Sequence, residues 1–383
     1  MINSESVNGC DARKRIVFLI SSLAGGGAER VFVTLLRHID RNYFEPHLVL
    51  LRAEGEFICQ VPNDIAIHVL DGAQRRHSLL GLFLLMCSLV QLLWKLRPRT
   101  VLSTGRINLA LALARPLLPR GTKILIRECS VLSVRLKTDT RYPRVWRWLY
   151  QCLYRWADNV VCLSDSMVKD MTEEFNVPQR RSVRIYNPID IDLVRELGKS
   201  GENPYTGAGP QLVAAGRLSN EKGFDLLLAA MPKVIECFPN VLLTILGQGP
   251  LKPALAAQVE RLGLTESVSF LGFQQNPWPY LYHADLFVLP SRREGFSNVL
   301  LEVLALETPA VAVDCPGAIR EIYGENPVVR LVPAGDASGL AEAIVERCRA
   351  TRQERTNAKA PPDWLAKFAL QRIMGEYSAL FLG

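Results

Sequence analysis

A basic pair follows an apolar run in the second half of the chain. The run 211–215 ends at Gly216, Arg217 comes next, and Lys222 lies shortly after it, where a helix is expected to start. A guanidinium can bind two phosphate oxygens at once, and an ammonium adds a point charge. Backbone N–H groups at a helix start would bind the same anion. The pattern indicates a diphosphate site, with a solvated turn carrying two surface cations as the alternative.

Two glutamates follow the later apolar run 286–289. Glu294 lies in a glycine-containing turn, and Glu302 lies eight residues further on (302 − 294 = 8), in a segment with a helical pattern. If the helix begins between them, both carboxylates can face one ligand, and the N–H groups of 297–300 can point at its phosphates. Such a pair is common by itself, but it is much less common after a strand end and a phosphate-type loop. The two motifs together therefore predict one binding site.

A glycine-rich turn follows the first apolar run of the chain. Gly25, Gly26 and Gly27 would let the backbone come close to a ligand. Their spacing differs from that of a dinucleotide fingerprint, which disfavours a Rossmann dehydrogenase. Glu29 and Arg30 come next, and an ion pair in the first turn of a helix is the plain interpretation of these two residues.

One acid pair resembles a metal motif. Asp190 and Asp192 directly follow Asn187 and Pro188, so we interpret them as a helix start or a turn. The rest of the sequence has no cluster with the ligand density of a metal site, and its five histidines form no triad pattern. We therefore predict that the protein needs no metal and no cofactor besides its substrates.

Apolar runs alternate with helical patterns through both halves of the chain. In the first half these runs are 15–20, 47–51, 65–70, 100–103, 123–126 and 159–163. In the second half they are 211–215, 241–246, 268–271, 286–289 and 310–313. Repeated strand–helix units indicate parallel, doubly wound sheets. The predicted fold class is α/β, with two Rossmann-like parallel-sheet domains that face each other across a cleft.

The length of 383 residues suits two cores. We expect a first domain over 1–190 and a linker rich in Gly, Ser, Asn and Pro over 191–209. A second domain, which contains the phosphate and carboxylate motifs, would cover 210–361, and a C-terminal helix in 362–383 would pack back on the first domain.

Charge and composition favour an anionic partner in the cytoplasm. The formal charge is +7 with a pI near 9.0, the nine cysteines show no metal or disulfide spacing, and the N-terminus lacks the order of a secretory signal.

Segment 79–94 is apolar but short for a membrane span, so a buried helix and a membrane contact are both open. Segment 135–156 interleaves arginines with tyrosines and tryptophans, which suits a lipid headgroup layer. Binding of single-stranded nucleic acid would leave the phosphate and carboxylate motifs unexplained.

In their order and spacing, the motifs of the second half resemble those of the family-4 retaining glycosyltransferases, or glycosyl transferases group 1, which have the GT-B fold. The matching residues are Gly216-Arg217-Leu218, Glu221-Lys222-Gly223, Gly247-Gln248-Gly249-Pro250, Phe270-Leu271-Gly272, Ala284-Asp285, Leu289-Pro290-Ser291, Glu294-Gly295-Phe296, Glu302, Pro316-Gly317 and Glu321.

This resemblance implies roles for the residues of the donor site. Arg217 and Lys222 would hold the donor diphosphate and act in catalysis with Glu294, which would contact the transferred sugar. Glu302 would bind the ribose hydroxyls, and the backbone near Gly272 and Phe273 would meet the base. The other donor-binding residues would be Gly26, Gly27, Gly216, Gly295, Phe296, Ser297, Asn298, Val299 and Leu300. Retention needs no base behind the sugar if the leaving phosphate takes the acceptor proton, as the resemblance suggests.

On the acceptor side, the resemblance assigns Glu29 and Arg30 to the lining of the site. The family often carries a His after the fourth or fifth strand of this domain, but segment 126–130 here reads Ile-Arg-Glu-Cys-Ser. Arg127 and Glu128 are the remaining candidates for acceptor binding, with a surface ion pair as the alternative.

The predicted function is retaining transfer of a hexosyl or N-acetylhexosaminyl group from a nucleotide sugar to a lipid-linked cell-envelope glycan of the polysaccharide, O-antigen or lipopolysaccharide type. Such an enzyme would work peripherally on the inner face of the cytoplasmic membrane, without binding nucleic acid. A GT-B nucleotide-sugar epimerase and a non-catalytic, membrane-associated scaffold remain as alternatives.

Overall fold

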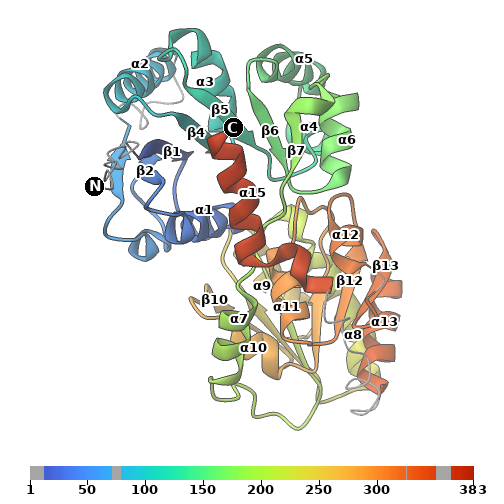
Figure 1. The fold of residues 1–383 in the computed structure, drawn as a ribbon. Coiled ribbons are helices and arrows are strands. Elements are labelled where there is room, and N and C mark those ends of the chain that lie inside the picture. Colours follow the sequence, from blue (N-terminus) through green and yellow to red (C-terminus); the bar gives the residue numbers. More distant parts are fainter. Residues whose placement is uncertain (1–12, 71–78, 325, 351–363) are drawn as a thin grey trace, which may run out of the picture. The chain divides into compact units, whose positions relative to one another are not determined.

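The computed structural model describes residues 13–70, 79–324, 326–350 and 364–383. The chain divides into two compact units. The first unit comprises the chain up to Arg127 together with Tyr150–Val160 and Ser378–Gly383, and the second comprises Glu128–Leu149 and Val161–Tyr377. Figure 1 shows the course of the chain through both.

The first sheet has seven strands in the order β3-β2-β1-β4-β5-β6-β7, and the pairings among β1 to β5 are parallel. Its strands are β1 (Lys14–Ile20), β2 (Phe44–Leu50), β3 (Ala66–Val69), β4 (Thr100–Thr104), β5 (Lys123–Arg127), β6 (Asn159–Cys162) and β7 (Ser182–Arg184). Strand β1 ends in five consecutive buried apolar residues, the pattern expected when helices cover both faces of a parallel sheet.

Helices alternate with these strands. They are α1 (Gly27–His38), α2 (Leu79–Leu96), α3 (Ile107–Ala114), α4 (Leu132–Asp139), α5 (Pro143–Tyr154) and α6 (Asp165–Glu173), with short 3-10 turns η1 (Ile58–Gln60), η3 (Arg115–Leu117) and η4 (Gln179–Arg181). Helix α1 packs on the sheet through apolar side chains. Its buried Phe32 meets Phe18 of β1 edge to face, with 5.6 Å between ring centroids.

The second sheet has six strands in the order β10-β9-β8-β11-β12-β13, again paired in parallel. Its strands are β8 (Gln211–Ala215), β9 (Leu242–Leu246), β10 (Val268–Gly272), β11 (Leu286–Leu289), β12 (Ala310–Asp314) and β13 (Val329–Pro333). The order reverses beside β8, between β9 and β11, which is the switch point where open α/β sheets bind ligands.

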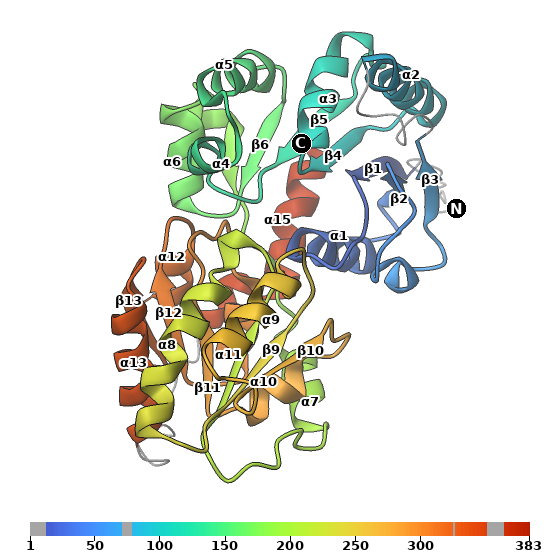
Figure 2. The ribbon, with the colours of Figure 1, turned by 180° about the vertical axis from the view of Figure 1, so that it is seen from behind.

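Helices lie on both faces of the second sheet, as Figures 1 and 2 show from opposite sides. Helix α8 (Phe224–Cys237) packs against α9 (Lys252–Arg261) and α13 (Ala337–Arg349), while α7 (Ile191–Lys199) packs against α10 (Trp278–His283) and α11 (Asn298–Ala305). The remaining elements are η5 (Asn220–Lys222), α12 (Ile319–Tyr323), η6 (Trp364–Phe368) and α15 (Leu370–Leu382).

The alternating pattern thus predicted the two parallel sheets correctly. The pattern did not predict two strands, the three-residue β7 and β13, whose second residue is the exposed Arg330, because neither forms a continuous apolar run. The segment 191–209, interpreted as a linker, contains α7, whose Val194 is buried. The end of α15 packs within the first unit, where Phe381 lies 6.1 Å from Phe18 and 5.9 Å from Phe44 between ring centroids.

Candidate active site

The basic loop after β8 lies directly against the loop after β11. Gly223 adopts the left-handed conformation (φ +65°), and a Cβ at this position would lie 2.1 Å from the carbonyl oxygen of Pro290. The backbone N–H of Arg292 donates to the carbonyl oxygen of Glu221 at 2.9 Å. Only glycine permits this close approach, so the Glu221-Lys222-Gly223 motif acts as a joint between the two loops.

Lys222 and Glu294 meet at this joint. The Nζ atom of Lys222 lies 2.6 Å from Oε1 of Glu294, and the hydroxyl of Ser291 donates to the same oxygen at 2.7 Å. The side chain of Glu294 is 5% exposed and that of Lys222 is 22% exposed. A buried carboxylate needs such partners, because an unpaired charge away from water is costly. The pair places a cation and a carboxylate side by side at the carboxyl ends of β8 and β11.

A further turn, after β12, fixes the backbone of Glu294. The N–H of Glu294 donates to the carbonyl oxygen of Pro316 at 3.1 Å. A Cβ on Gly317 (φ +133°) would overlap the carbonyl oxygen of Glu294 at 1.3 Å. Burial, together with the nearby Glu294 carboxylate, raises the pKa of the neighbouring Cys315 thiol to about 12, so this cysteine stays protonated and is no nucleophile.

Helix α11 begins between the two glutamates, as their spacing predicted. Ser297 caps it and accepts a hydrogen bond from the N–H of Leu300, which occupies one of the donors expected to meet a phosphate. Glu302 is buried in the second turn. Glu294 and Glu302 therefore flank the start of one helix, where the positive end of the helix dipole also lies.

The glycines after β9 support the turn that carries Arg217. A Cβ on Gly247 (φ +132°) would lie 1.9 Å from the carbonyl oxygen of Gly216, and one on Gly249 would lie 2.3 Å from that of Leu218. The N–H of Gly247 donates to the carbonyl oxygen of Gly272 at 2.7 Å. These contacts bring the turn 216–218 and Gly272 to the same edge of the sheet. Arg217 is exposed there, and Phe273 is half-buried.

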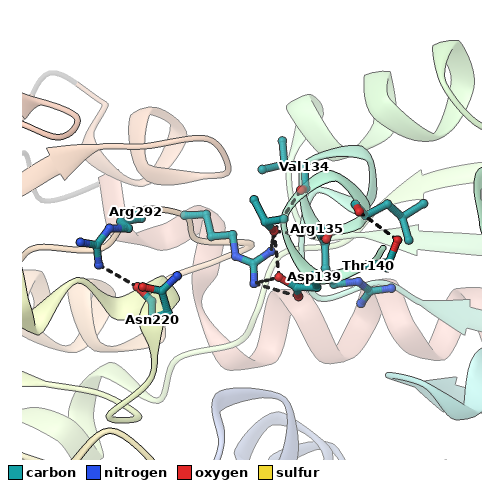
Figure 3. A network of polar contacts seen from close by, with 9 residues as sticks. Val134, Arg135, Asp139, Thr140, Asn220 and Arg292 are labelled. Atoms are coloured by element: carbon teal, nitrogen blue, oxygen red, sulfur yellow. Dashed lines mark hydrogen bonds and ion pairs between the residues drawn. The ribbon is translucent and has the colours of Figure 1, made fainter. Parts of the chain in front are cut away.

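Arg292, in the loop after β11, is bonded to the loop after β8 and to the start of α8. This residue was not singled out from the sequence. Its guanidinium donates to both carboxylate oxygens of Asp225 at 2.6 Å each, and to the carbonyl oxygen of Asn220 at 3.0 Å, the contact drawn in Figure 3. These hydrogen bonds hold the pKa of Asp225 below its ordinary value. A bidentate pair of this kind fixes geometry as well as charge.

Arg293, the next residue, reaches the opposite way to helix α4. It donates to Thr138 Oγ1 at 2.7 Å and to the two carboxylate oxygens of Asp139 at 2.8 and 2.9 Å. Figure 3 labels Asp139 on this helix, together with Arg292 and Asn220. A Cβ on Gly295 would lie 1.8 Å from the carbonyl oxygen of Cys129, so the turn around Glu294 rests on the segment after β5. All of these residues belong to the second unit.

The first-unit residues predicted to bind ligands lie around two strand ends. Gly26 is the N-cap of α1, Gly27 is its first residue, and Glu29 lies in its first turn. The guanidinium of Arg30 lies over the ring of Phe57 at 5.5 Å.

Arg127 and Glu128 are both buried, which contradicts the alternative of a surface ion pair. The carbonyl oxygen of Arg127, the last residue of β5, accepts hydrogen bonds from Thr104 and Asn108, each at 3.2 Å. The carboxylate of Glu128 lies 3.7 Å from the guanidinium of Arg135. Neither burial could be predicted from sequence, because it depends on the packing of α3 against β5 and on the position of Arg135 beside Glu128.

The acid pair after Pro188 forms a helix start, as predicted. Asp190 caps α7 and accepts from the N–H of Leu193 at 3.1 Å, and Asp192 lies in the first turn. Within the described ranges, no three His, Cys, Asp or Glu residues are grouped as a metal site would require.

Comparison with known proteins gives two matching family models. Residues 25–193 match the model described as Glycosyltransferase Family 4, and residues 209–349 match the one described as Glycosyl transferases group 1. The chain is 28% identical over 335 residues to the N-acetylgalactosamine-N,N'-diacetylbacillosaminyl-diphospho-undecaprenol 4-alpha-N-acetylgalactosaminyltransferase of Campylobacter jejuni, covering 86% of this chain and 89% of that one.

Two other similarities cover one half or all of the chain. A phosphatidyl-myo-inositol mannosyltransferase of Mycobacterium leprae is 34% identical over 172 residues, which are 44% of each protein. The crystal structure of HepE from Anabaena, in complex with UDP and glucose, superimposes with a TM-score of 0.77 at 21% identity, covering 97% of this chain and all of that one.

Proposed function

The chain belongs to the family-4, group 1 glycosyltransferases with the GT-B fold, and from this premise we propose that it transfers a sugar with retention from a nucleoside diphosphate sugar to a lipid-linked cell-envelope glycan. The observation that carries the proposal is the joint at which Lys222 meets the buried Glu294 beside the start of α11.

The chemistry follows from the charges at this joint. When the bond between the sugar and its phosphate oxygen breaks, negative charge collects on the leaving diphosphate, and Arg217 and Lys222 would stabilise it without a metal. Glu294 would face the transferred sugar and Glu302 the ribose hydroxyls, while the backbone at Gly272 and Phe273 would meet the base. Retention is accounted for if the acceptor attacks from the face that the diphosphate leaves and gives its proton to that diphosphate.

The names of the relatives support this donor and acceptor. HepE was crystallised with UDP and glucose, and the Campylobacter relative is named for a diphospho-undecaprenol acceptor. We propose an acceptor of the same class, a glycan on a lipid diphosphate, with a hexosyl or N-acetylhexosaminyl group transferred. Glu29 and Arg30 would contact the acceptor. Arg127 and Glu128, which are buried, would support the backbone on the acceptor side of the site.

Helix α5 supports work at the inner face of the cytoplasmic membrane. Tyr142, just before the helix, and Val145 and Trp148 on it are exposed, and Arg144 and Arg147 lie among them. Exposed aromatic rings beside arginines suit the boundary between headgroups and acyl chains. The described helices include none that is both long and apolar enough to cross a bilayer.

Thermal unfolding with a panel of nucleoside diphosphates tests the donor site. One of them at 100 times its Kd should raise the free energy of unfolding by about 2.7 kcal/mol, and this gain should disappear in K222A. No stabilisation by any of them would support the non-catalytic scaffold instead.

Once the stabilising nucleoside diphosphate is known, nucleotide sugars with the same base are incubated with the protein without acceptor. This experiment distinguishes a transferase from an epimerase. Only an epimerase would convert the sugar itself. Adding lipid-diphosphate acceptors should then give a glycoside with the anomeric configuration of the donor, which NMR coupling constants report directly; an inverted product would refute retention.

A further inference from the structure

A basic pocket lies at the amino edge of the first sheet, away from the strand ends that carry the site residues. The segments before β1, β4 and β5 meet there, because the N–H of Arg99 donates to the carbonyl oxygen of Arg15 and the N–H of Lys123 donates to that of Arg99, both at 2.9 Å. They enclose an open cavity of about 1300 Å³. The seven residues of β1 separate it from the glycine turn at the carboxyl edge by about 20 Å.

Positive charge dominates this amino-edge pocket. Its basic lining residues are Arg13, Lys14, Arg15, Arg97, Arg99 and Arg120. The lining includes one acid, Glu45, which is already paired with Arg15 at 3.2 Å. Such a concentration of like charge opposes folding unless an anion binds there. The pocket therefore fits a ligand that carries several phosphate charges.

The backbone conformation of Arg97 also supports an anion-binding site. Arg97 follows the last residue of α2 in the left-handed conformation (φ +46°), where glycine or asparagine is usual. Its N–H donates to the carbonyl oxygen of Leu93 at 2.9 Å, as a helix end requires. An arginine here has a conformational cost that a glycine would avoid, and in return it adds a cation to the pocket.

An apolar rim borders the charged lining. Trp94, which is 50% exposed, donates its indole N–H to the carbonyl oxygen of Leu117 at 2.8 Å, and Leu117 is 56% exposed. Phe83 is exposed on the same face of α2 as Trp94, three turns earlier, while Leu89 and Leu93 on the other face are buried. A soluble phosphate would need no such rim, whereas a lipid brings acyl chains beside its headgroup.

We propose that the amino-edge pocket binds the phosphate groups of anionic membrane lipids, with Trp94 and Leu117 at the acyl boundary. It is a contact with the membrane separate from helix α5, and it rests on the proposed work at the membrane surface. Each basic residue close to an anionic bilayer strengthens binding by about fivefold.

Vesicle co-sedimentation of the full chain tests this site. Wild type should bind vesicles of phosphatidylcholine mixed with phosphatidylglycerol and bind pure phosphatidylcholine weakly. R97Q/R99Q/R120Q should bind the mixed vesicles about 100-fold more weakly. The matched control R180Q/K252Q/R261Q removes the same charge, from +7 to +4, at exposed positions outside the pocket, and should stay within about threefold of wild type.

Further arms identify the source of the phosphate. Equal vesicle binding by the two triple variants overturns the proposal, as does absence of wild-type binding to the mixed vesicles. If inorganic pyrophosphate raises the Tm of wild type but not of R97Q/R99Q/R120Q, and vesicle binding is equal, the ligand is a soluble phosphate and the lipid assignment is wrong.

The donor site serves as the independent readout. R97Q/R99Q/R120Q should keep its stabilisation by nucleoside diphosphate, whereas K222A should lose it and still bind vesicles. If no nucleoside diphosphate stabilises wild type but wild type still binds the mixed vesicles, the proposed function is refuted and the proposed lipid site is not.

Discussion

Nζ of Lys222 lies 2.6 Å from Oε1 of Glu294, and the two residues are separated by 72 positions in the chain. The carboxylate is buried and the ammonium is partly open to solvent, so the cation faces outward from a fixed counter-charge. This contact holds the Lys222 side chain in position before a diphosphate arrives. Such preorganisation is worth more in catalysis than the same charge on a mobile side chain.

K222A should reduce transfer by at least about 100-fold, which corresponds to about 2.7 kcal/mol of transition-state stabilisation. K222R keeps the charge but changes its shape and should recover only part of the rate. Initial rates with the identified donor measure both. E294Q separates the two partners, because it keeps the volume of Glu294 and removes its charge; near-normal rates in E294Q would exclude a role for that carboxylate at the sugar.

The clamp between Arg292 and Asp225 should stabilise the folded chain by about 1 kcal/mol, since both side chains are about one-third exposed or more and water screens the pair. A double-mutant cycle with R292Q and D225N, measured by denaturant unfolding, gives the coupling energy directly. Additive effects of the two changes would show that the clamp contributes nothing.

The same pair predicts a pH dependence. Hydrogen bonds from Arg292 lower the pKa of Asp225 from its ordinary value of 3.8, so the folded state binds this proton less readily than the unfolded state. The stabilisation is therefore complete above about pH 4 and is lost as the pH falls through the lower, folded pKa. The difference in free energy of unfolding between wild type and D225N should shrink in that acid range. A difference that grows on acidification would contradict the assignment.

Arg293 is expected to position Glu294 by tying its turn to α4. R293Q should lower kcat about tenfold with little change in the donor KM, because the binding cations remain in place. D139N should produce a similar but smaller effect, and R293K, which cannot form the forked contact, should lie between R293Q and wild type. A change confined to Tm, with kcat unaltered, would reduce this contact to a structural one.

Gly317→Ala should destabilise the chain by about 2–4 kcal/mol and abolish transfer, because the new Cβ would overlap the carbonyl oxygen of Glu294. Gly335→Ala is the matched control. Gly335 also has a positive φ, of +81°, but nothing lies within 4 Å of the position that the new methyl group would take, so its cost of about 1 kcal/mol reflects backbone strain alone. Equal losses in the two variants, measured by urea unfolding, would refute the close contact at Gly317.

The strands themselves and the start of α11 could be predicted from local pattern. Strands such as β8 and β11 are continuous apolar runs because both faces of a parallel sheet are covered, and glycine turns mark their ends. The helix start at Ser297 follows from a capping residue before an apolar helical segment. These signals lie within a few residues of each other, so the sequence alone determined the two sheets and the elements that carry the donor motifs.

Tertiary structure decided which charges meet. Arg292 and Arg293 are adjacent in the sequence, yet Arg292 pairs with Asp225 in α8 and Arg293 pairs with Asp139 in α4. Arg127 was a candidate for acceptor binding, with a surface ion pair as the alternative, and its full burial could not be predicted from the sequence. The physical reason is that the partner and the burial of a long charged side chain depend on strand order and helix packing across many tens of residues, which no local periodicity records.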